Sequence, residues 1–533
     1  MPLNVLLVAS EAFPLAKTGG LGDMVSAYAA ALRDAGVEVS ILMPAYPAAL
    51  EGAVDVVPVA RMTGLPGGDA RLLRGQMPDS GVTVLLLQMD HLFAREGLYR
   101  DPHGRDYLDN LTRFASLAAA ATRIARGVRN LKRPDIVHAH DWHAGLTPLY
   151  LRVAGVAAKS VFTIHNLAFQ GNHPLAMGSW IGVPPELLVP ALTDERSIEF
   201  YGLLSMMKAG IVHADRVTTV SQRYAHEIVT PHFGHGMEGV LQAQQTKLSG
   251  IVNGIDTSVW NPATDPLIAR RYRVDDTAGK HACKRELQQA FGLTRDPFAP
   301  LVAIGSRLTE QKMADVAVRA LPTLLQQHPR LQFAVLGQGE HGLEHAMQEL
   351  AAAWPGRVGV QIGYDERRAH ALHAGADILL HGSRFEPCGL TQLYAMRYGT
   401  IPVASRVGGL ADTIVDYAPH EARDETCATG VLFDGDQPHD VVHAMERALA
   451  AFVRPAAWHA LQRNAMSRDS GWERSTSNYL ALYAQLVDAR PAPRDLRVRK
   501  APTRTRTAAS AKGRQARGEA SFDTGTGELA RSA

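Results

Sequence analysis

Residues 3–10 read LNVLLVAS, a nearly continuous apolar run. Such a run is typical of a short strand that is buried on both faces of a parallel sheet. After a glycine turn, Val25, Tyr28 and Leu32 share one face of a helix, and Gly36 stands where a C-cap is expected. The pattern predicts a strand, a turn and an amphipathic helix, which is the repeating unit of an α/β fold.

The same unit recurs along the chain in two series. Strands are predicted at 37–43, 135–140, 161–166 and 216–221 in the first series, and at 301–306, 332–337, 377–382 and 401–405 in the second. Between them, residues 247–266 break the periodicity with Asn, Gly, Asp and Pro. We therefore predict two Rossmann-like, doubly wound parallel-sheet domains, residues 1–250 and 251–490, with the last helix packing back on the first. They should face each other across a deep cleft, where ligands bind beyond the carboxyl ends of the strands.

Composition excludes several classes of protein. Hydrophobic residues make up 46% of the 533 residues and charged residues 20%, the balance of a globular chain. No apolar run reaches the roughly 18 residues of a membrane span, and the N-terminus lacks the basic region of a signal peptide. The three cysteines, Cys283, Cys388 and Cys427, are far apart, which argues against disulfides and against a cysteine zinc site. We expect a cytoplasmic protein with no membrane partner.

The C-terminal tail differs in charge from the rest of the chain. Residues 494–533 contain ten basic and four acidic residues, whereas the remainder contains 45 and 49. The tail has almost no large apolar residues, so we predict that it is disordered. A basic tail can contact nucleic acid or another polyanion, but a solvated appendage is the favoured interpretation, and no nucleic-acid partner is expected.

A glycine-rich turn, KTGGLGD at residues 17–23, follows the first predicted strand. Gly19 and Gly20 would let backbone N–H groups approach an anion, and the helix that starts there would add the positive end of its dipole. Lys17 would add a formal charge. The spacing is neither the dinucleotide fingerprint nor a P-loop, and a plain tight turn is the alternative interpretation.

Two cations occupy the loop after the strand at 301–306. Arg307 and Lys312 lie five residues apart in SRLTEQK, where a planar fork and a point charge could hold a diphosphate without a metal. The alternative is a pair of solvated loop cations.

A carboxylate follows the strand at 377–382, in the segment SRFEPCGLT. Glu386 can accept hydrogen bonds from sugar hydroxyls, and the backbone amides from Gly389 to Thr391 form a second candidate anion site. A buried carboxylate without a function would be costly, so the functional interpretation depends on Glu386 being buried.

Histidines gather in HAHDWH, residues 138–143. Three histidines and an aspartate look like metal ligands, but no distant ligand set with convincing spacing completes a site. We favour a polar, sugar-contacting loop, since the face of Trp142 can pack on the apolar side of a pyranose. His165 ends a predicted strand and, taken alone, is typical of a structural histidine.

Together these segments resemble the bacterial glycogen synthase and plant starch synthase family, which are retaining glycosyltransferases of the GT-B fold. Eight motifs stand in family order between Asn4 and Leu486: KTGGLGD, HDWHAG, FTIHNLAFQG, NGIDTSVWNPATD, SRLTEQK, GYDE, SRFEPCGLTQLYAMRYG and GGLADT. The resemblance implies transfer of glucose from ADP-glucose to the non-reducing 4-OH of an α-1,4-glucan such as glycogen or maltodextrin. It implies no cofactor and no metal.

The resemblance also implies roles for individual residues, matched motif by motif. The implied catalytic set is Glu386, Arg307, Lys312, His165 and Asp141. The implied ADP-glucose contacts are Lys17, Gly19, Gly20, Asn166, Asn253, Tyr364, Cys388, Gly389, Leu390 and Thr391, with Tyr364 stacking on adenine. Tyr99, Trp142 and His143 are implied to lie near the acceptor glucan.

Two residues depart from the family pattern. Gly382 precedes Ser383 where the family usually has proline, and Met313 follows Lys312 where the family usually has glycine. Neither change removes a charged group, so we expect activity to survive. The alternatives that remain are a glucosyltransferase of the same fold that uses UDP-glucose, a metal-dependent hydrolase built on HAHDWH, and a polyanion-binding protein that acts through its tail.

Overall fold

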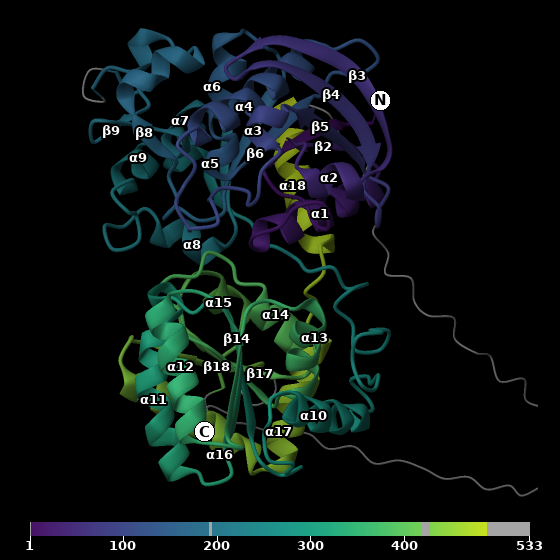
Figure 1. Cartoon of the computed structure of the whole chain (residues 1–533), viewed down its shortest axis with the longest axis vertical. Helices are drawn as coiled ribbons and strands as arrows, with labels where there is room; N and C mark the ends of the chain where they lie inside the picture. Colours follow the sequence, from purple (N-terminus) through teal and green to yellow (C-terminus); the bar gives the residue numbers. More distant parts are fainter. Residues whose placement is uncertain (1, 191–193, 418–426, 488–533) are drawn as a thin grey trace, which may run out of the picture. The chain divides into compact units, whose positions relative to one another are not determined.

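The computed structural model describes residues 2–190, 194–417 and 427–487. The tail predicted at residues 494–533 lies outside these ranges. Within them the chain forms two large sheets and one small one, with helices around each large sheet (Figure 1). No described helix has both the length and the apolar character needed to cross a membrane.

The first large sheet has nine strands in the order β12-β11-β7-β6-β1-β2-β5-β4-β3. The strands are β1 (Asn4–Val8), β2 (Glu38–Pro44), β3 (Val54–Leu65), β4 (Gly68–Gln76), β5 (Thr83–Gln88), β6 (Ile136–His140), β7 (Lys159–Ile164), β11 (Arg216–Thr219) and β12 (Leu248–Gly250). Pairing is parallel from β12 to β5, while β4 is antiparallel to both β5 and β3. The sheet is therefore parallel with an antiparallel edge.

The chain changes direction across this sheet at β1. It builds β2 and β5 on one side of β1 and then returns to β6 and β7 on the other. In doubly wound sheets a ligand binds where the strand order reverses, beyond the carboxyl ends of the strands. The turn after β1 and the start of α5 directly after β6 leave this switch point; the turn carries Glu11 and Lys17, and α5 begins with Asp141.

The second large sheet is entirely parallel, in the order β15-β14-β13-β16-β17-β18. Its strands are β13 (Leu301–Gly305), β14 (Gln332–Gly337), β15 (Val358–Ile362), β16 (Ile378–His381), β17 (Ile401–Ser405) and β18 (Val431–Phe433). Here the reversal falls between β13 and β16. The loops after these two strands carry Arg307, Lys312 and Glu386, which brings the predicted charged groups to one end of the sheet.

Helices cover both sheets. With the first sheet are α1 (Gly20–Asp34), α2 (Pro47–Gly52), α3 (Asp90–Phe93), α4 (Asn110–Arg126), α5 (Asp141–Ala144), α6 (Leu146–Val153), α7 (Met206–His213), α8 (Gln222–Glu227) and α9 (Glu238–Ala243). With the second are α10 (Ala278–Ala290), α11 (Ala314–Gln327), α12 (His341–Ala353), α13 (Glu366–Gly375), α14 (Thr391–Arg397), α15 (Gly408–Thr413), α16 (Pro438–Phe452) and α17 (Pro455–Ser467). Helix α18 (Glu473–Val487) closes the described chain.

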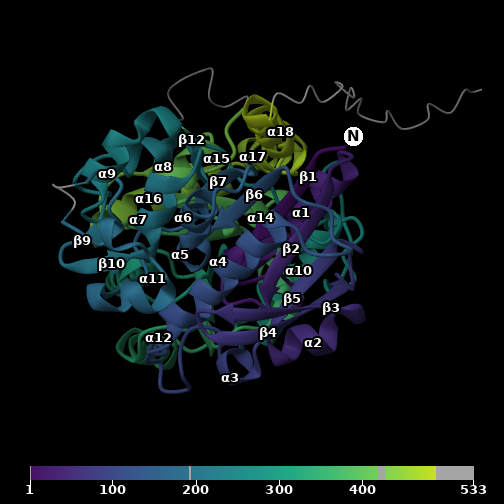
Figure 2. The same ribbon diagram turned by 90° about the horizontal axis from the view of Figure 1, so that it is seen from above.

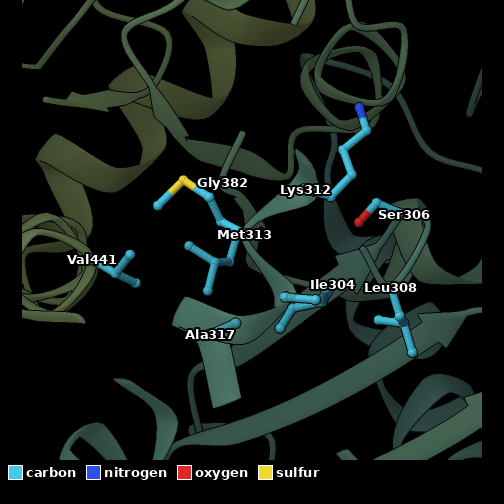
Figure 3. Close-up of a pocket in the computed structure, with 10 residues that line it drawn as sticks. Ile304, Ser306, Leu308, Lys312, Met313, Ala317, Gly382 and Val441 are labelled. Carbon is cyan, nitrogen blue, oxygen red and sulfur yellow. The ribbon is translucent and has the colours of Figure 1, made fainter. Parts of the chain in front are cut away.

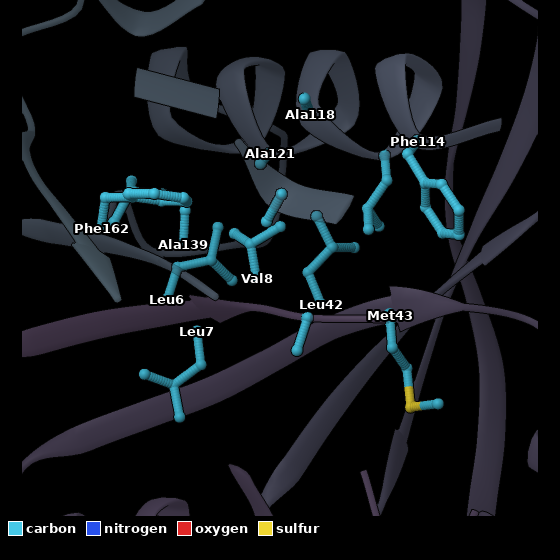
Figure 4. Close-up of a cluster of buried hydrophobic side chains, with 14 of the residues drawn as sticks. Leu6, Leu7, Val8, Leu42, Met43, Phe114, Ala118, Ala121, Ala139 and Phe162 are labelled. Atoms are coloured by element: carbon cyan, nitrogen blue, oxygen red, sulfur yellow. The ribbon is translucent and has the colours of Figure 1, made fainter. Parts of the chain in front are cut away.

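Short side chains let helix α4 lie close to the first sheet. Ala118 and Ala121 face the apolar side chains of the central strands, among them Leu6 and Leu42 (Figure 4). Phe114, from the same helix, is fully buried. Burial of apolar surface on both faces of the strands is what the continuous run at 3–10 predicts.

The buried apolar residues form one cluster with the first sheet and two with the second. The first contains buried residues from Val5 to Ile251 and takes in Tyr479 and Tyr483 of α18, whereas the other two lie between Ile255 and Met466. Helix α18 lies beside α1 (Figures 1 and 2), and Tyr483 Oη is 2.8 Å from Tyr28 Oη. The last helix thus packs on the first sheet's core.

The predicted strands are confirmed, and the helix expected over residues 25–35 is α1. Gly36 follows the capping residue Ala35 with φ of +88°, and its N–H donates to Arg33 O, as expected of a helix-ending glycine. Strands β3, β4, β5, β12, β15 and β18 were not predicted, nor was the small sheet of β8 (Asn172–Pro174), β10 (Leu203–Ser205) and β9 (Glu199–Phe200). The edge hairpin of β3 and β4 carries many exposed polar residues and a proline, so it lacks the apolar run that reveals a central strand. Strand β5 lies inside the sheet, is apolar and largely buried, and was missed all the same.

Candidate active site

Glu11 organises the turn after β1, and the sequence alone did not single it out. Its carboxylate is buried, with 2% of the residue exposed. It accepts hydrogen bonds from the Thr18 amide and hydroxyl, both at 2.7 Å, and from the Gly19 amide at 3.3 Å. The Tyr99 hydroxyl donates to the same carboxylate. An acidic residue directly after a strand at the switch point is the signal that could have revealed it.

Lys17 lies between an acidic partner and an aromatic ring. Its Nζ is 2.9 Å from Asp23 Oδ2, 3.5 Å from Tyr364 Oη and 5.4 Å from the centre of the Tyr364 ring. Burial raises the pKa of Asp23, although Lys17 opposes that shift. At the neighbouring Gly20, a Cβ atom would stand 3.5 Å from Leu390 Cδ1. Four residues predicted to contact one substrate, Lys17, Gly20, Tyr364 and Leu390, are thus brought together.

Glu386 is the most heavily bonded carboxylate among the predicted site residues. Only 6% of the residue is exposed. Its Oε2 atom pairs with Lys312 Nζ, lies 3.1 Å from His381 Nε2 and accepts a hydrogen bond from Ser383 Oγ at 3.1 Å. The condition set by the sequence, that Glu386 be buried, is met.

The charge of Glu386 follows from these partners. Burial acts to raise the pKa of the carboxyl, but the Lys312 ammonium and the hydrogen bond from His381 hold the pKa well below its usual range. The group is therefore ionised at neutral pH. His381, the last residue of β16, was missed by sequence reasoning; burial lowers its pKa.

Arg307 stands in the same loop as Lys312 but in a different environment. It is exposed, its Nη2 donates to Gln311 Oε1 at 3.0 Å, and it forms no ion pair with any residue in the described ranges. Gln311 also ties the two loops together, since its O accepts from the Arg384 amide at 2.9 Å and its Nε2 donates to Phe385 O at 3.3 Å. One cation is thus engaged with Glu386 and the other is free to meet an anion.

Helix α14 begins at the end of the Glu386 loop. Gly389 has φ of +70°, and a Cβ atom there would collide with the Gln392 side chain, so glycine is required. The amides of Leu390 and Thr391 have no hydrogen-bond acceptor within the described part of the chain. Cys388 is buried, which raises the pKa of its thiol to about 12. The thiol is therefore neutral.

The two departures from the family pattern are neighbours in space. Met313 takes the left-handed conformation, with φ of +53°, and its side chain is buried. A Cβ atom on Gly382 would stand 3.1 Å from Met313 Cβ, so the missing side chain at 382 leaves room for the methionine. Both residues line a cavity of about 20 Å³ beside Lys312 and Ser306 (Figure 3).

Asp141 is strained and buried at the carboxyl end of β6. Its φ is +60°, a conformation that costs a residue with a side chain about 1 kcal/mol or more. Burial raises its pKa to about 8, although the Trp142 amide donates to its Oδ1 at 2.9 Å. The carboxyl is therefore mostly protonated at neutral pH.

His165 is neutral and oriented by a neighbour. Burial lowers its pKa to about 3, and its Nε2 is 3.1 Å from His140 Nδ1. In the next residue, Asn166, the side-chain oxygen accepts from the Ala168 amide at 3.0 Å. Asn253 lies beside Cys388, and its own side-chain oxygen is buried without a partner in the described residues.

The residues implied to lie near the acceptor form one aromatic cluster. The Tyr99 and His143 rings stack at 4.3 Å, and the Trp142 and His143 ring centres are 4.0 Å apart. Trp142 and Tyr99 are partly exposed, whereas His143 is buried and burial lowers its pKa. His143 therefore packs against the Tyr99 and Trp142 rings and offers little exposed surface to a ligand.

The histidines of HAHDWH differ in their partners: within the described residues, His140 Nε2 and both ring nitrogens of His143 are buried without a hydrogen-bond partner. His138 lies 2.6 Å from Tyr483 Oη and 2.6 Å from Thr163 Oγ1, so both ring nitrogens are engaged. In the described part of the chain, no group of three or more His, Cys, Asp or Glu side chains is arranged to hold a metal ion. The sequence predicted a loop here, which is wrong: His138 and His140 belong to β6, and Asp141, Trp142 and His143 belong to α5.

Comparison with known proteins extends these observations. The profile of the starch synthase catalytic domain matches residues 4–243, and that of group 1 glycosyl transferases matches residues 289–459. Glycogen synthases from Ralstonia nicotianae and Burkholderia thailandensis are 54% and 51% identical; the alignments cover 92% and 96% of this chain and 90% and 96% of theirs.

Two solved structures share the fold. The catalytic domain of starch synthase IV from Arabidopsis thaliana, bound to ADP and acarbose, has a TM-score of 0.82 and 29% identity, over 92% of this chain and all of that one. Sucrose-phosphate synthase from Thermosynechococcus elongatus has a TM-score of 0.57 at 18% identity, over 91% and 99%, which shows the fold alone. From the motifs, the two sheets and these relatives, we conclude that this chain belongs to the glycogen synthase and starch synthase family of GT-B glycosyltransferases.

Proposed function

We propose that the chain transfers glucose from ADP-glucose to the non-reducing 4-OH of an α-1,4-glucan, with retention of configuration. The observation that carries this proposal is the ionised, buried Glu386 held by Lys312 and His381, beside a free Arg307 and the start of α14. The Arabidopsis structure supports the choice of ligands, because it holds ADP and acarbose.

The leaving ADP would meet fixed positive groups. Breaking the bond between glucose and phosphate leaves negative charge on ADP, which Arg307, Lys312 and the amides of Leu390 and Thr391 would stabilise. The glucosyl group gains positive character in the same step. The Glu386 carboxylate, ionised at neutral pH, would lie near that charge and stabilise it.

The sugar would be held by neutral groups from the first sheet. Asp141, mostly protonated at pH 7, can donate a hydrogen bond to a hydroxyl, and the neutral His165 can bond the 6-hydroxyl of the glucose. Tyr99 and Trp142 would bind the acceptor glucan. We propose attack by the acceptor on the same face as the departing phosphate, which takes up the acceptor's proton.

The adenine would stack on Tyr364, whose ring is 60% exposed and lies near Lys17. We propose that neither a metal nor another cofactor takes part, since fixed cations face the diphosphate. A cytoplasmic location and the absence of a nucleic-acid partner stay predictions.

The test is transfer of radiolabel from ADP-glucose to glycogen, with UDP-glucose as the competing donor and excess EDTA in a parallel reaction. The proposal expects label in glycogen from ADP-glucose, much less from UDP-glucose, and full rate in EDTA. Preferred use of UDP-glucose would contradict the proposed donor and identify UDP-glucose in its place. Loss of activity in EDTA would indicate that the reaction depends on a metal ion.

A further inference from the structure

A buried histidine on α13 lies between two carboxylates, and none of the groups proposed for the reaction includes it. His370 Nδ1 is 2.7 Å from Asp265 Oδ2, and its Nε2 is 3.5 Å from Glu366 Oε1. The side chain of Asp265 has no exposed surface and that of His370 has 2%. An imidazole between two acids can serve both only when both of its nitrogens carry protons.

The surroundings allow the ring one orientation. Trp260 stacks on His370 with ring centres 3.9 Å apart and planes 14° apart, and it also stacks on Tyr394 at 3.8 Å. Asp265 is fixed in turn, because Tyr398 Oη donates to its Oδ2 at 2.5 Å and the Leu267 amide donates to its Oδ1 at 2.8 Å. A ring held this firmly can fix the position of a side chain that it contacts.

Glu366 connects this buried group to an exposed ring. Its carboxylate accepts a hydrogen bond from the Tyr364 hydroxyl, and the Tyr364 ring is 60% exposed beside Lys17. The series of contacts therefore runs from Asp265 through His370 and Glu366 to Tyr364. Its two outer links are hydrogen bonds, whereas the link between His370 Nε2 and Glu366 is an ion-pair contact, since Nε2 forms no hydrogen bond within the described residues. Without His370, nothing in this series would anchor Glu366 to the buried part of the domain.

We propose that His370 is a positioning residue for nucleotide binding: its imidazolium anchors Glu366, and Glu366 fixes the Tyr364 ring against the nucleobase. The proposal rests on the proposed function, in which Tyr364 stacks on adenine. His370 touches neither the substrate nor the reacting atoms, so it should act on donor affinity and not on the chemical step.

The charge of His370 is consistent with this role. Burial acts to lower its pKa, but the Asp265 and Glu366 carboxylates prevail and raise the pKa to about 8. The same contacts, with Tyr364, lower the pKa of Glu366 to about 2 although burial opposes them.

The other ionisable groups that face this pair are few. Tyr398 approaches Asp265 from the end of α14, His373 lies on α13 itself, and Lys17 and Asp23 approach Glu366 from the first domain. Burial lowers the pKa of His373 to about 3, so His373 stays neutral throughout the physiological range. Because the His370 pKa is raised, its charge is present below about pH 8 and is lost as the pH rises through that value.

The test compares the wild-type protein with His370→Gln and with the matched control His373→Gln, a buried histidine one turn along the same helix. KM for ADP-glucose, kcat and the Kd for ADP by calorimetry are measured for each. We expect His370→Gln to raise KM and Kd about five- to tenfold, the effect of losing roughly one net hydrogen bond, with kcat nearly unchanged. His373→Gln should match the wild type in all three.

The pH profile supplies a readout that a merely structural role would not move. The wild-type Kd for ADP should rise severalfold between pH 7 and pH 9, whereas that of His370→Gln should stay flat. Glu366→Gln, at a partly exposed position, should show the same weak binding and the same flat profile even if His370→Gln folds poorly.

The outcomes separate this inference from the proposed function. A wild-type protein that neither binds ADP nor uses ADP-glucose contradicts the proposed function. A wild-type protein that does both, with unchanged KM and an unchanged pH profile in His370→Gln and Glu366→Gln, overturns the positioning role alone. So does an equal fall of kcat in the His370 and His373 variants.

Discussion

Glu386→Gln removes one charge from the centre of the site and keeps the shape of the side chain. In the structure, Oε2 of this carboxylate accepts hydrogen bonds from the side chains of Lys312, His381 and Ser383. A glutamine keeps an oxygen that accepts hydrogen bonds, but it cannot balance the positive charge that develops on the glucosyl group. A group of this kind contributes about 3 to 4 kcal/mol, so we expect kcat to fall about 10²- to 10³-fold. KM for ADP-glucose should change little.

Stability must be separated from catalysis in this variant. Lys312, whose side chain is 13% exposed, loses its charged partner, and an unpaired buried charge destabilises a protein by about 3 kcal/mol or more. Lys312→Met combined with Glu386→Gln removes both charges and should recover much of that stability. The rate should not recover, because the double variant lacks both the carboxylate and the cation. Thermal unfolding monitored beside initial rates distinguishes the two effects.

Two results would refute this reasoning. The first is a kcat for Glu386→Gln that matches the wild type, which would remove the carboxylate from catalysis. The second is a double variant that regains both stability and rate, because the loss in the single variant would then come only from the unpaired Lys312. Binding of ADP by calorimetry checks that the donor site is intact in Glu386→Gln; in the double variant it should weaken, because Lys312 is a proposed phosphate contact.

Three further predictions concern the groups around this centre. Asp141 has a pKa of about 8, so kcat should fall as the pH rises through 8 and the Asp141 proton is lost. Asp141→Asn should abolish this alkaline fall. If the fall is unchanged in the variant, another group causes it. Gly389→Ala should destabilise the loop by about 1 kcal/mol or more and lower kcat, since φ at this position is +70° and the new Cβ atom would collide with the Gln392 side chain. A variant with the wild-type Tm and rate would contradict this prediction. Gly382→Ala should lower kcat, because the new Cβ atom would contact Met313 closely. Adding Met313→Gly to this variant should restore kcat. Failure of this rescue would show that the two residues are not coupled.

The sequence predicts most of the central strands because they are buried on both faces, but it misses β5. Runs such as 3–10 have polar residues only at Asn4 and Ser10 and an unbroken apolar stretch between them, so their length and composition identify them. The edge hairpin of β3 and β4 has one face in solvent, and its pattern is mixed. Local sequence therefore identifies the strands that position the site better than those at the margin.

The site was predicted in part, and the omissions have a common cause. Lys312 and Glu386 were expected in one region, but their direct pairing depends on how the loops after β13 and β16 meet, which no local pattern encodes. Glu11 and His381 were missed for the same reason, since each is a single polar residue at a strand end whose role lies in contacts with distant residues. The raised pKa of Asp141 depends on burial, which is a property of the packed structure.

The most direct test of the central claim is a crystal structure of the protein with ADP and a short maltodextrin. The account predicts the two phosphates within hydrogen-bond distance of Arg307, Lys312 and the amide of Leu390 or Thr391, with the adenine on Tyr364. A diphosphate bound elsewhere, with Arg307 directed into solvent and Lys312 still engaged only by Glu386, would contradict it.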